Sequence, residues 1–295
     1  MDWSATLNSI VSAAAPLILA TIGETISEKS GVINLSLEGS LRLSAMVGFV
    51  GAFWAGHVLV GFVAAMLVGA LIATIIAFGN IKLKINQIAL GFVLYLLAVE
   101  LASFLGDPFV GERGEQVPPL PIPGLSEIPF IGKVLFDHNL VVYGSFFAVF
   151  ATWYLFYRTR AGLTIHGIGE RPEGAFARGI PVNRLRFVYT VIGGALVGLA
   201  GAAYSLDVKL GWRETLTLNL GWIALAIVIF GSWHPVRVAM GCYLFGALQV
   251  AAFQLQDVFP GLAQVLPIAP FPLMILALVM IYAGWFVRLG DRWPR

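Results

Sequence analysis

Residues 30–49, SGVINLSLEGSLRLSAMVGF, are long and apolar enough to cross a bilayer, yet polar and charged residues interrupt them. Such side chains are costly in hydrocarbon unless they face a cavity or one another. Glu38 and Arg42 are spaced i, i+4, so they can pair on one helix face. Asn34 is expected to share that face, whereas Ser36 points elsewhere. The stretch therefore predicts a polar helix face inside a membrane.

This polar face has two interpretations. Glu38 and Arg42 can form a structural bridge between helices, or the face can line a translocation path. A second expected span, residues 217–231, also begins with a polar, glycine-interrupted stretch, which runs from Asn219 to Trp222. Corresponding interruptions in two inverted halves point to a transporter's central site. Asn34, Ser36, Glu38, Arg42, Asn219 and Trp222 are therefore candidates for the path.

Composition places the whole chain in a membrane. Hydrophobic residues make up 59% of it, the mean hydropathy is +0.87, and only 12% of residues are charged, against about 25% in soluble domains. Apolar runs of about 17 to 25 residues cross a bilayer as helices. We expect a single all-α transmembrane domain over residues 1–295, with the first four spans candidates for an inverted repeat of the last four. The nine spans expected are 8–27, 32–55, 59–79, 86–105, 139–157, 187–205, 217–231, 238–256 and 267–288.

Lysine and arginine predict the orientation, because they concentrate in cytoplasmic loops. With a cytoplasmic C-terminus and an outer N-terminus, the outer loops hold only Arg113, Lys133, Lys209 and Arg213. The inner side then collects Lys29, Lys82, Lys84, Arg158, Arg160, Arg171, Arg178, Arg184, Arg186, Arg237, Arg288, Arg292 and Arg295.

Two segments remain outside the spans. Residues 106–138 are rich in proline, which breaks regular helix, so we expect either a short cap on the outer face or a passive linker. Residues 158–186 are amphipathic and charged, and Pro172 suits an early position of a short helix. This inner segment is either a docking surface for another protein or a loop on the membrane surface.

Four blocks of the chain resemble one family. They are GETISEKSGVINLSLEGSLRLSAMVG, NQIALGFVLYLLAVELASFLG, YRTRAGLTIHGIGERPEGAFARGIPVNRLRFVYTVIGGALVGLAGAAYSL and LGWIALAIVIFGSWHPVRVAMGCYLFGALQVAAFQLQ. In this order they resemble permease subunits of bacterial ABC importers for nucleosides and simple sugars. The resemblance implies a multi-pass protein of the inner membrane, a second permease chain that is often a distinct relative, an ATPase subunit and an extracytoplasmic binding protein.

The resemblance also implies roles for particular residues. The Asn-Gln pair Asn86 and Gln87 matches a family block, which adds a path-lining role to the simpler one of capping a helix. Amides and aromatic rings suit a neutral polyhydroxylated or heterocyclic substrate. The inner segment matches the family region that docks on the ATPase, although Arg171 stands where asparagine is usual. The expected coupling residues are Gly169, Glu170, Arg171, Pro172, Glu173, Ala175, Phe176, Ala177, Arg178 and Gly179.

Other functional classes are less well supported. The chain contains no HExxH, GxSxG or Walker P-loop motif, so we expect no catalysis in it and ATP with magnesium in the partner ATPase. The chain has one cysteine and four scattered histidines, so we expect no metal site. Its basic residues do not cluster on one face, so we expect no nucleic-acid binding. A secondary carrier that uses Glu38 as a proton or ion site is the alternative.

Overall fold

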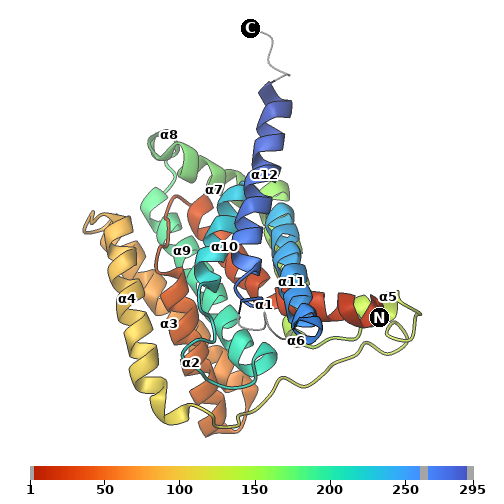
Figure 1. Cartoon of the computed structure of the whole chain (residues 1–295). Coiled ribbons are helices and arrows are strands. Elements are labelled where there is room, and N and C mark those ends of the chain that lie inside the picture. Colours follow the sequence, from red (N-terminus) through yellow and green to blue (C-terminus); the bar gives the residue numbers. More distant parts are fainter. Residues whose placement is uncertain (1–2, 260–264, 291–295) are drawn as a thin grey trace.

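The computed structural model describes residues 3–259 and 265–290, and helices form its framework (Figure 1). No β-strand occurs within these two ranges, in which the only β-pairing is two isolated bridges. The helices are α1 (Trp3–Lys29), α2 (Leu37–Ala55), α3 (Val58–Ile81), α4 (Gln87–Gly106), η1 (Asp107–Phe109), α5 (Ile131–Leu135), α6 (Leu140–Arg158), α7 (Arg160–Glu170), α8 (Pro172–Ala177), α9 (Val182–Ala203), the π-helical turn η2 (Tyr204–Val208), α10 (Leu220–Phe230), α11 (Pro235–Val258) and α12 (Pro270–Gly290).

Each of the nine predicted spans overlaps one of these helices. Among the described residues, six helices are long and apolar enough to cross a membrane: α1, α3, α4, α6, α9 and α11. The other three helices are less apolar or shorter. Helix α2 carries two charges near its start, and α10 has 11 residues. In α12 the apolar stretch whose side chains are described runs only from Pro270 to Met280. The all-α prediction is confirmed, whereas nine crossings stay a prediction.

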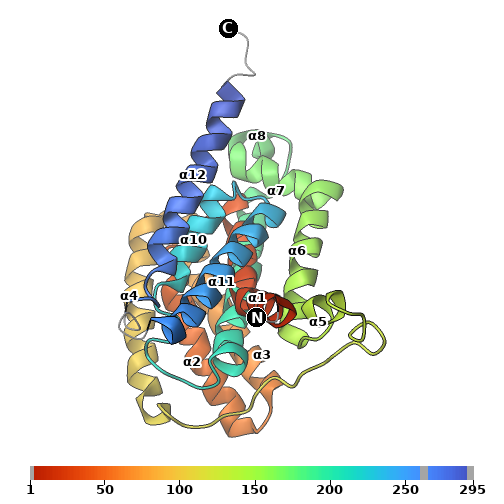
Figure 2. The same ribbon diagram turned by 45° about the vertical axis from the view of Figure 1, so that its right-hand side comes forward.

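Helix α1 bends on entering the bundle. Its first turns run across the other helices and its later turns enter between them (Figures 1 and 2). Pro16 lies inside the helix and removes a backbone hydrogen bond, which is the usual cause of such a kink. From Ala14 to Ser27 every residue is buried, so this half of α1 is surrounded by protein on all sides.

Helix α9 packs against α1, α2 and α3 through glycines. A Cβ added at Gly69 of α3 would overlap the carbonyl oxygen of Gly194, and one added at Gly23 of α1 would overlap that of Gly193. Small residues let the backbones of membrane helices approach this closely. The pattern GGALVGLAGAA in α9 therefore fixes a tight central block of helices.

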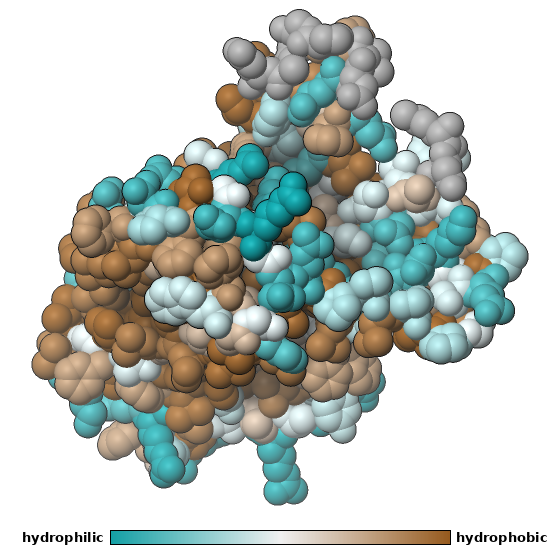
Figure 3. All heavy atoms as spheres, turned by 90° about the horizontal axis from the view of Figure 1, so that it is seen from below, coloured by the Kyte–Doolittle hydropathy of each residue, from teal (hydrophilic) through white to brown (hydrophobic). Residues whose placement is uncertain are grey.

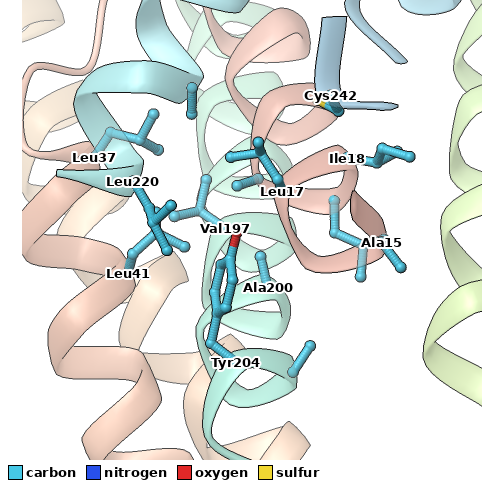
Figure 4. Close-up of a cluster of buried hydrophobic side chains, with 14 of the residues drawn as sticks. Ala15, Leu17, Ile18, Leu37, Leu41, Val197, Ala200, Tyr204, Leu220 and Cys242 are labelled. Atoms are coloured by element: carbon cyan, nitrogen blue, oxygen red, sulfur yellow. The ribbon is translucent and has the colours of Figure 1, made fainter. Parts of the chain in front are cut away.

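A buried apolar cluster joins this block to α10 (Figure 4). Leu17 of α1, Leu41 of α2, Val197 of α9 and Leu220 of α10 all belong to it, and the ring of Tyr204 rises beside them from the end of α9. The start of α10 is therefore held between α2 and α9.

The outer faces of α3 and α4 are apolar and exposed. Seen from the end of the molecule opposite α8, hydrophobic residues gather over the side formed by these helices (Figure 3). Large exposed side chains on α4 include Ile88, Phe92, Val93, Leu96, Leu97, Phe104 and Leu105. A soluble protein rarely exposes such a continuous surface, and it suits contact with lipid tails or another membrane subunit.

Residues 106–139 cross the end of the bundle opposite α7 and α8 (Figures 1 and 2). The amide nitrogen of Val117 donates to the carbonyl oxygen of Leu206 at 3.1 Å. The side chain of Asn8 donates to the carbonyl oxygens of Lys133 at 2.6 Å and Asp137 at 3.1 Å. These bonds anchor the segment, here called the cap, to α1 and to the end of α9, although most of its residues are exposed.

The glycine contacts predict opposite effects for one substitution at two sites. Alanine within a helix gains about 0.5–1 kcal/mol over glycine, whereas overpacking a tight contact costs about 1–3 kcal/mol. Gly69→Ala should therefore lower the thermal unfolding temperature in detergent. Gly144→Ala on α6, where an added Cβ meets nothing within 4 Å, should leave it unchanged or raise it. Equal stability of the two variants would contradict the packing described here.

Candidate functional site

The carboxylate of Glu38 caps a helix that lies far away in the sequence. Glu38 stands in the first turn of α2, and its Oε1 accepts a hydrogen bond from the amide nitrogen of Asn219 at 3.0 Å. Its Oε2 accepts one from the amide nitrogen of Gly221 at 2.7 Å. The first amide groups of a helix lack partners within that helix, and its N-terminus favours negative charge. Glu38 therefore anchors the start of α10 to the start of α2.

The sequence NLGW makes this contact sterically feasible. Asn219 adopts a left-handed conformation with φ of 64°, which asparagine tolerates better than most residues. A Cβ added at Gly221 would overlap the backbone of Glu38, so only glycine allows the two helix ends to approach this closely. The polar interruption predicted at this span is a helix-to-helix junction.

Arg42 lies beside the cap. Its guanidinium is 4.0 Å from Oε1 of Glu38, and the two side chains are 10% and 4% exposed. The predicted i, i+4 pair is therefore present and buried. Three buried polar atoms near α2 and α10 have no hydrogen-bond partner among the described residues: Nε of Arg42, Oγ of Ser44 and Oγ1 of Thr217. An unmatched buried polar group costs about 1–3 kcal/mol, so these three atoms make the interior beside the Glu38 cap energetically unfavourable.

The expectation that Asn34 shares the helical face of Glu38 is wrong. Helix α2 begins at Leu37, and Asn34 belongs to the turn before it. Its side-chain oxygen accepts hydrogen bonds from the amide nitrogen of Ser36 at 3.0 Å and from Oγ of Ser36 at 2.7 Å. A local asparagine turn of this kind competes with helix. Asn34 and Ser36 therefore shape the entry to α2 rather than line its polar face.

Asn86 and Gln87 hold the start of α4 against the same turn. Oδ1 of Asn86 accepts hydrogen bonds from the amide nitrogens of Ile88 and Ala89 at 2.9 and 3.3 Å, so the predicted capping role is confirmed. Oε1 of Gln87 accepts one from the amide nitrogen of Ile33 at 3.3 Å. These two residues border the turn that leads into α2.

Trp222 reaches α4 from the first turn of α10. Its ring packs edge-on against that of Tyr95, with ring centroids 5.5 Å apart, and it is about one-third exposed. The eight residues predicted for the path thus lie around the junction of α2, α4 and α10. Ser36, Glu38 and Arg42 are buried in it, whereas Asn86 is exposed at its edge.

Two acidic residues of α1 were missed by the sequence analysis. Glu24 is 1% exposed, and its Oε1 accepts a hydrogen bond from the amide nitrogen of Asn34 at 3.0 Å. Glu28 accepts a hydrogen bond from the indole nitrogen of Trp233, over whose ring the Lys29 ammonium lies at 6.0 Å. Carboxyl groups four residues apart within an apolar span were the available signal, because ionisable residues there are expensive.

The predicted coupling segment forms a compact turn of two helices. Pro172 occupies the first turn of α8, as predicted. Ala175 is buried and packs with Ile168 and Val182, so it belongs to the interior of the segment. Phe176 is 73% exposed. The other predicted residues on the outer surface are Glu170, Arg171, Glu173, Ala177, Arg178 and Gly179.

This segment is fixed to the end of α1. A Cβ added at Gly169 would overlap the carbonyl oxygen of Lys29, so the two backbones touch. The Arg186 guanidinium donates to the carbonyl oxygens of Ser30 at 3.0 Å and Ile168 at 2.9 Å. A continuous chain of contacts therefore runs from α8 through the end of α1 to the turn at Asn34 and on to α2.

Comparison with known proteins gives one family. Residues 6–283 match the family described as "Branched-chain amino acid transport system / permease component". The guanosine ABC transporter permease protein NupQ of Bacillus subtilis is 33% identical over 299 residues, covering 94% of this chain and 93% of NupQ. The nucleoside ABC transporter permease protein NupC of Lactococcus lactis is 30% identical over 281 residues, covering 90% and 89%.

A third relative comes from an archaeon. TsgC13 of Haloferax volcanii, provisionally named a glucose ABC transporter permease protein, is 38% identical over 267 residues, which cover 89% of this chain and 81% of TsgC13. No solved structure matches the chain. The matched region contains both the Glu38 junction and the coupling segment. The chain therefore belongs to the permease components of ABC transporters, multi-pass subunits of the cell membrane that leave ATP hydrolysis to a separate ATPase.

Proposed function

We propose that this chain, with a second permease chain, forms the path by which a nucleoside or simple sugar enters the cell. The names of its relatives, which specify guanosine, nucleosides and glucose, support this substrate class. The observation that carries the proposal is the buried Glu38 junction, where two helices of the chain begin against each other. In many secondary transporters, helix ends that meet inside the membrane form the substrate site, and we propose the same use here.

The second permease is a distinct relative of this chain. Bacillus subtilis has two guanosine permease proteins, NupQ and NupP, which are 33% and 20% identical to this chain. Lactococcus lactis has two nucleoside permease proteins, NupC and NupB, which are 30% and 21% identical to it. In both organisms one of the two proteins resembles this chain more closely. We infer that this chain takes the corresponding place in a heterodimer.

The path uses neutral polar groups and aromatic rings. The neutral members proposed for it, beside the charged pair of Glu38 and Arg42, are Asn34, Ser36, Asn86, Gln87, Asn219 and Trp222. Hydroxyl groups and ring nitrogens of the substrate hydrogen-bond to amides, and a heterocyclic base stacks on an indole. The negative charge of Glu38 is matched by the start of α10 and by Arg42, so a neutral substrate meets little net charge there.

A binding protein delivers the substrate to the cap side, and an ATPase that binds ATP and magnesium acts at α8. We infer nine crossings, two inverted halves, an outer N-terminus and a cytoplasmic C-terminus. The structure supports this arrangement by placing α7 and α8 at the end opposite the 106–139 cap (Figure 1). Of the cations that predict it, Arg292 and Arg295 lie outside the described residues.

The topology is tested by labelling. Single cysteines at Glu173 and Glu115, both exposed, replace the native residues in a chain whose buried Cys242 is changed to serine. In intact cells a membrane-impermeant maleimide should label the cysteine at 115 but not that at 173. Opened cells should give both signals. Labelling of both positions in intact cells contradicts the proposed topology.

The docking role of α8 is tested with two exposed apolar residues. Phe176→Ala should reduce co-purification of the ATPase and lower transport, because an aromatic anchor at an interface typically contributes more than about 1 kcal/mol. Leu163→Ala on α7, where the native side chain is 77% exposed, is the matched control and should retain both.

Two alanines of α8 separate folding from docking. Ala177→Glu should give a folded permease that no longer couples, since Ala177 is exposed in this chain. Ala175→Glu should destabilise the segment itself, because Ala175 is buried. Normal ATPase association and normal substrate-stimulated ATP hydrolysis in both Phe176→Ala and Ala177→Glu would remove α8 as the docking element.

The role of Glu38 is tested by a double change. Glu38→Gln leaves Arg42 without its counter-charge, and breaking a buried pair in this way costs about 3–5 kcal/mol, so expression and transport should both fall. Glu38→Gln with Arg42→Gln removes the stranded charge and should restore part of the yield of folded protein, because glutamine keeps one of the two acceptors for α10. Uptake of labelled nucleoside or sugar should stay low if the pair serves the path. Full uptake by the double variant would make the pair purely structural.

A further inference from the structure

A groove lies beside the coupling segment, between the last turn of α3, helix α8 and the first turns of α9. Its volume is about 850 Å³, within the range of about 300–1,000 Å³ that is usual for ligand sites. The lining is mostly apolar and includes Phe78 and Ile81 of α3, Phe176 of α8 and Phe187 of α9.

The charged residues of the groove are predominantly basic. Lys82, Arg184 and Arg186 line it, against the single carboxylate of Glu173. The guanidinium of Arg186 is already bonded to two backbone carbonyl oxygens. The Lys82 and Arg184 side chains are exposed, and within the described ranges neither forms a hydrogen bond or an ion pair. These two cations are therefore available to an anionic ligand.

An apolar track leads away from this charged end. Leu67, Leu71, Ile75 and Phe78 follow one another at helical spacing on a single face of α3, and all four are exposed. On α9, which packs beside α3, Val188 and Ile192 are also exposed. Phe78 belongs to both the track and the groove, so the apolar surface is continuous between them.

We propose that this groove binds an anionic phospholipid, with the headgroup phosphate at Lys82 and Arg184 and the acyl chains along the exposed faces of α3 and α9. Basic pockets where membrane helices end at the cytoplasmic face suit such headgroups. A soluble phosphate would leave the apolar track uncovered. A segment of the ATPase would bind at the charged end without covering the track inside the membrane. The site lies against α8, so lipid bound there stiffens the support of the coupling segment.

The test uses the purified full-length chain in neutral detergent. Native mass spectrometry compares retention of phosphatidylglycerol and phosphatidylcholine with identical acyl chains. The wild-type chain should retain phosphatidylglycerol preferentially. Lys82→Gln with Arg184→Gln should weaken that binding roughly thirtyfold, from about 1 kcal/mol for each cation near an anionic lipid. Lys84→Gln with Arg160→Gln removes the same charge from exposed positions outside the groove and should leave binding intact.

Several outcomes overturn the proposal. Equal retention of the two lipids by the wild-type chain, or equal loss in the two double variants, excludes a specific site. Displacement of phosphatidylglycerol by inorganic phosphate alone shows a simple anion site. If phosphatidylglycerol is displaced by the purified ATPase subunit, and the Lys82 and Arg184 variant loses ATPase association, the groove is a protein interface instead.

Discussion

The arrangement of this permease depends on one carboxylate placed between two helix ends. Glu38 stands in the first turn of α2, yet its two oxygens accept hydrogen bonds from the amides of Asn219 and Gly221 at the start of α10, 181 and 183 residues further along the chain. Without this acceptor, α10 would begin with unpaired amides inside an apolar cluster. The same interaction neutralises a charge that the membrane interior would otherwise disfavour. Burial of Glu38 and formation of α10 are therefore mutually dependent.

Contacts around this junction link the two ends of the molecule. Asn34 binds Glu24 and shapes the turn before α2, and the end of α1 touches Gly169 and Arg186 of the coupling region. At the other end, Asn8 holds the 106–139 cap. Helix α1 thus contacts both the cap and the segment expected to meet the ATPase. Through Asn34, the same helix also contacts the turn that leads into α2 and Glu38.

The sequence predicted more of the architecture than of the site. Each of the nine apolar runs coincides with a helix, because hydrophobic length is a local property. The pairing of Glu38 with Arg42 was also predictable, since both stand on one helix. The capping of α10 by Glu38 was not, because it depends on the left-handed turn at Asn219 and on a close approach at Gly221 that only the folded chain creates.

The face assigned to Asn34 was wrong because its side chain binds locally to Ser36 and delays the start of α2. Glu24 and Glu28 were recognisable by charge, but their hydrogen bonds to the Asn34 amide and the Trp233 indole follow only from the folded chain.

The glycine contacts of α9 restrict how the helices around it can move. Where backbones touch directly, there is no layer of side chains that can change rotamer to absorb a shift, so α1, α2, α3 and α9 can separate only by losing whole surfaces of contact at once. Helices α11 and α12 pack through larger, more adaptable side chains such as Phe245, Phe271 and Met274. A movement of the same size therefore breaks fewer contacts there than among the helices packed through glycine. The molecule has a stiff half and a compliant half, and Glu38 lies on the line between them.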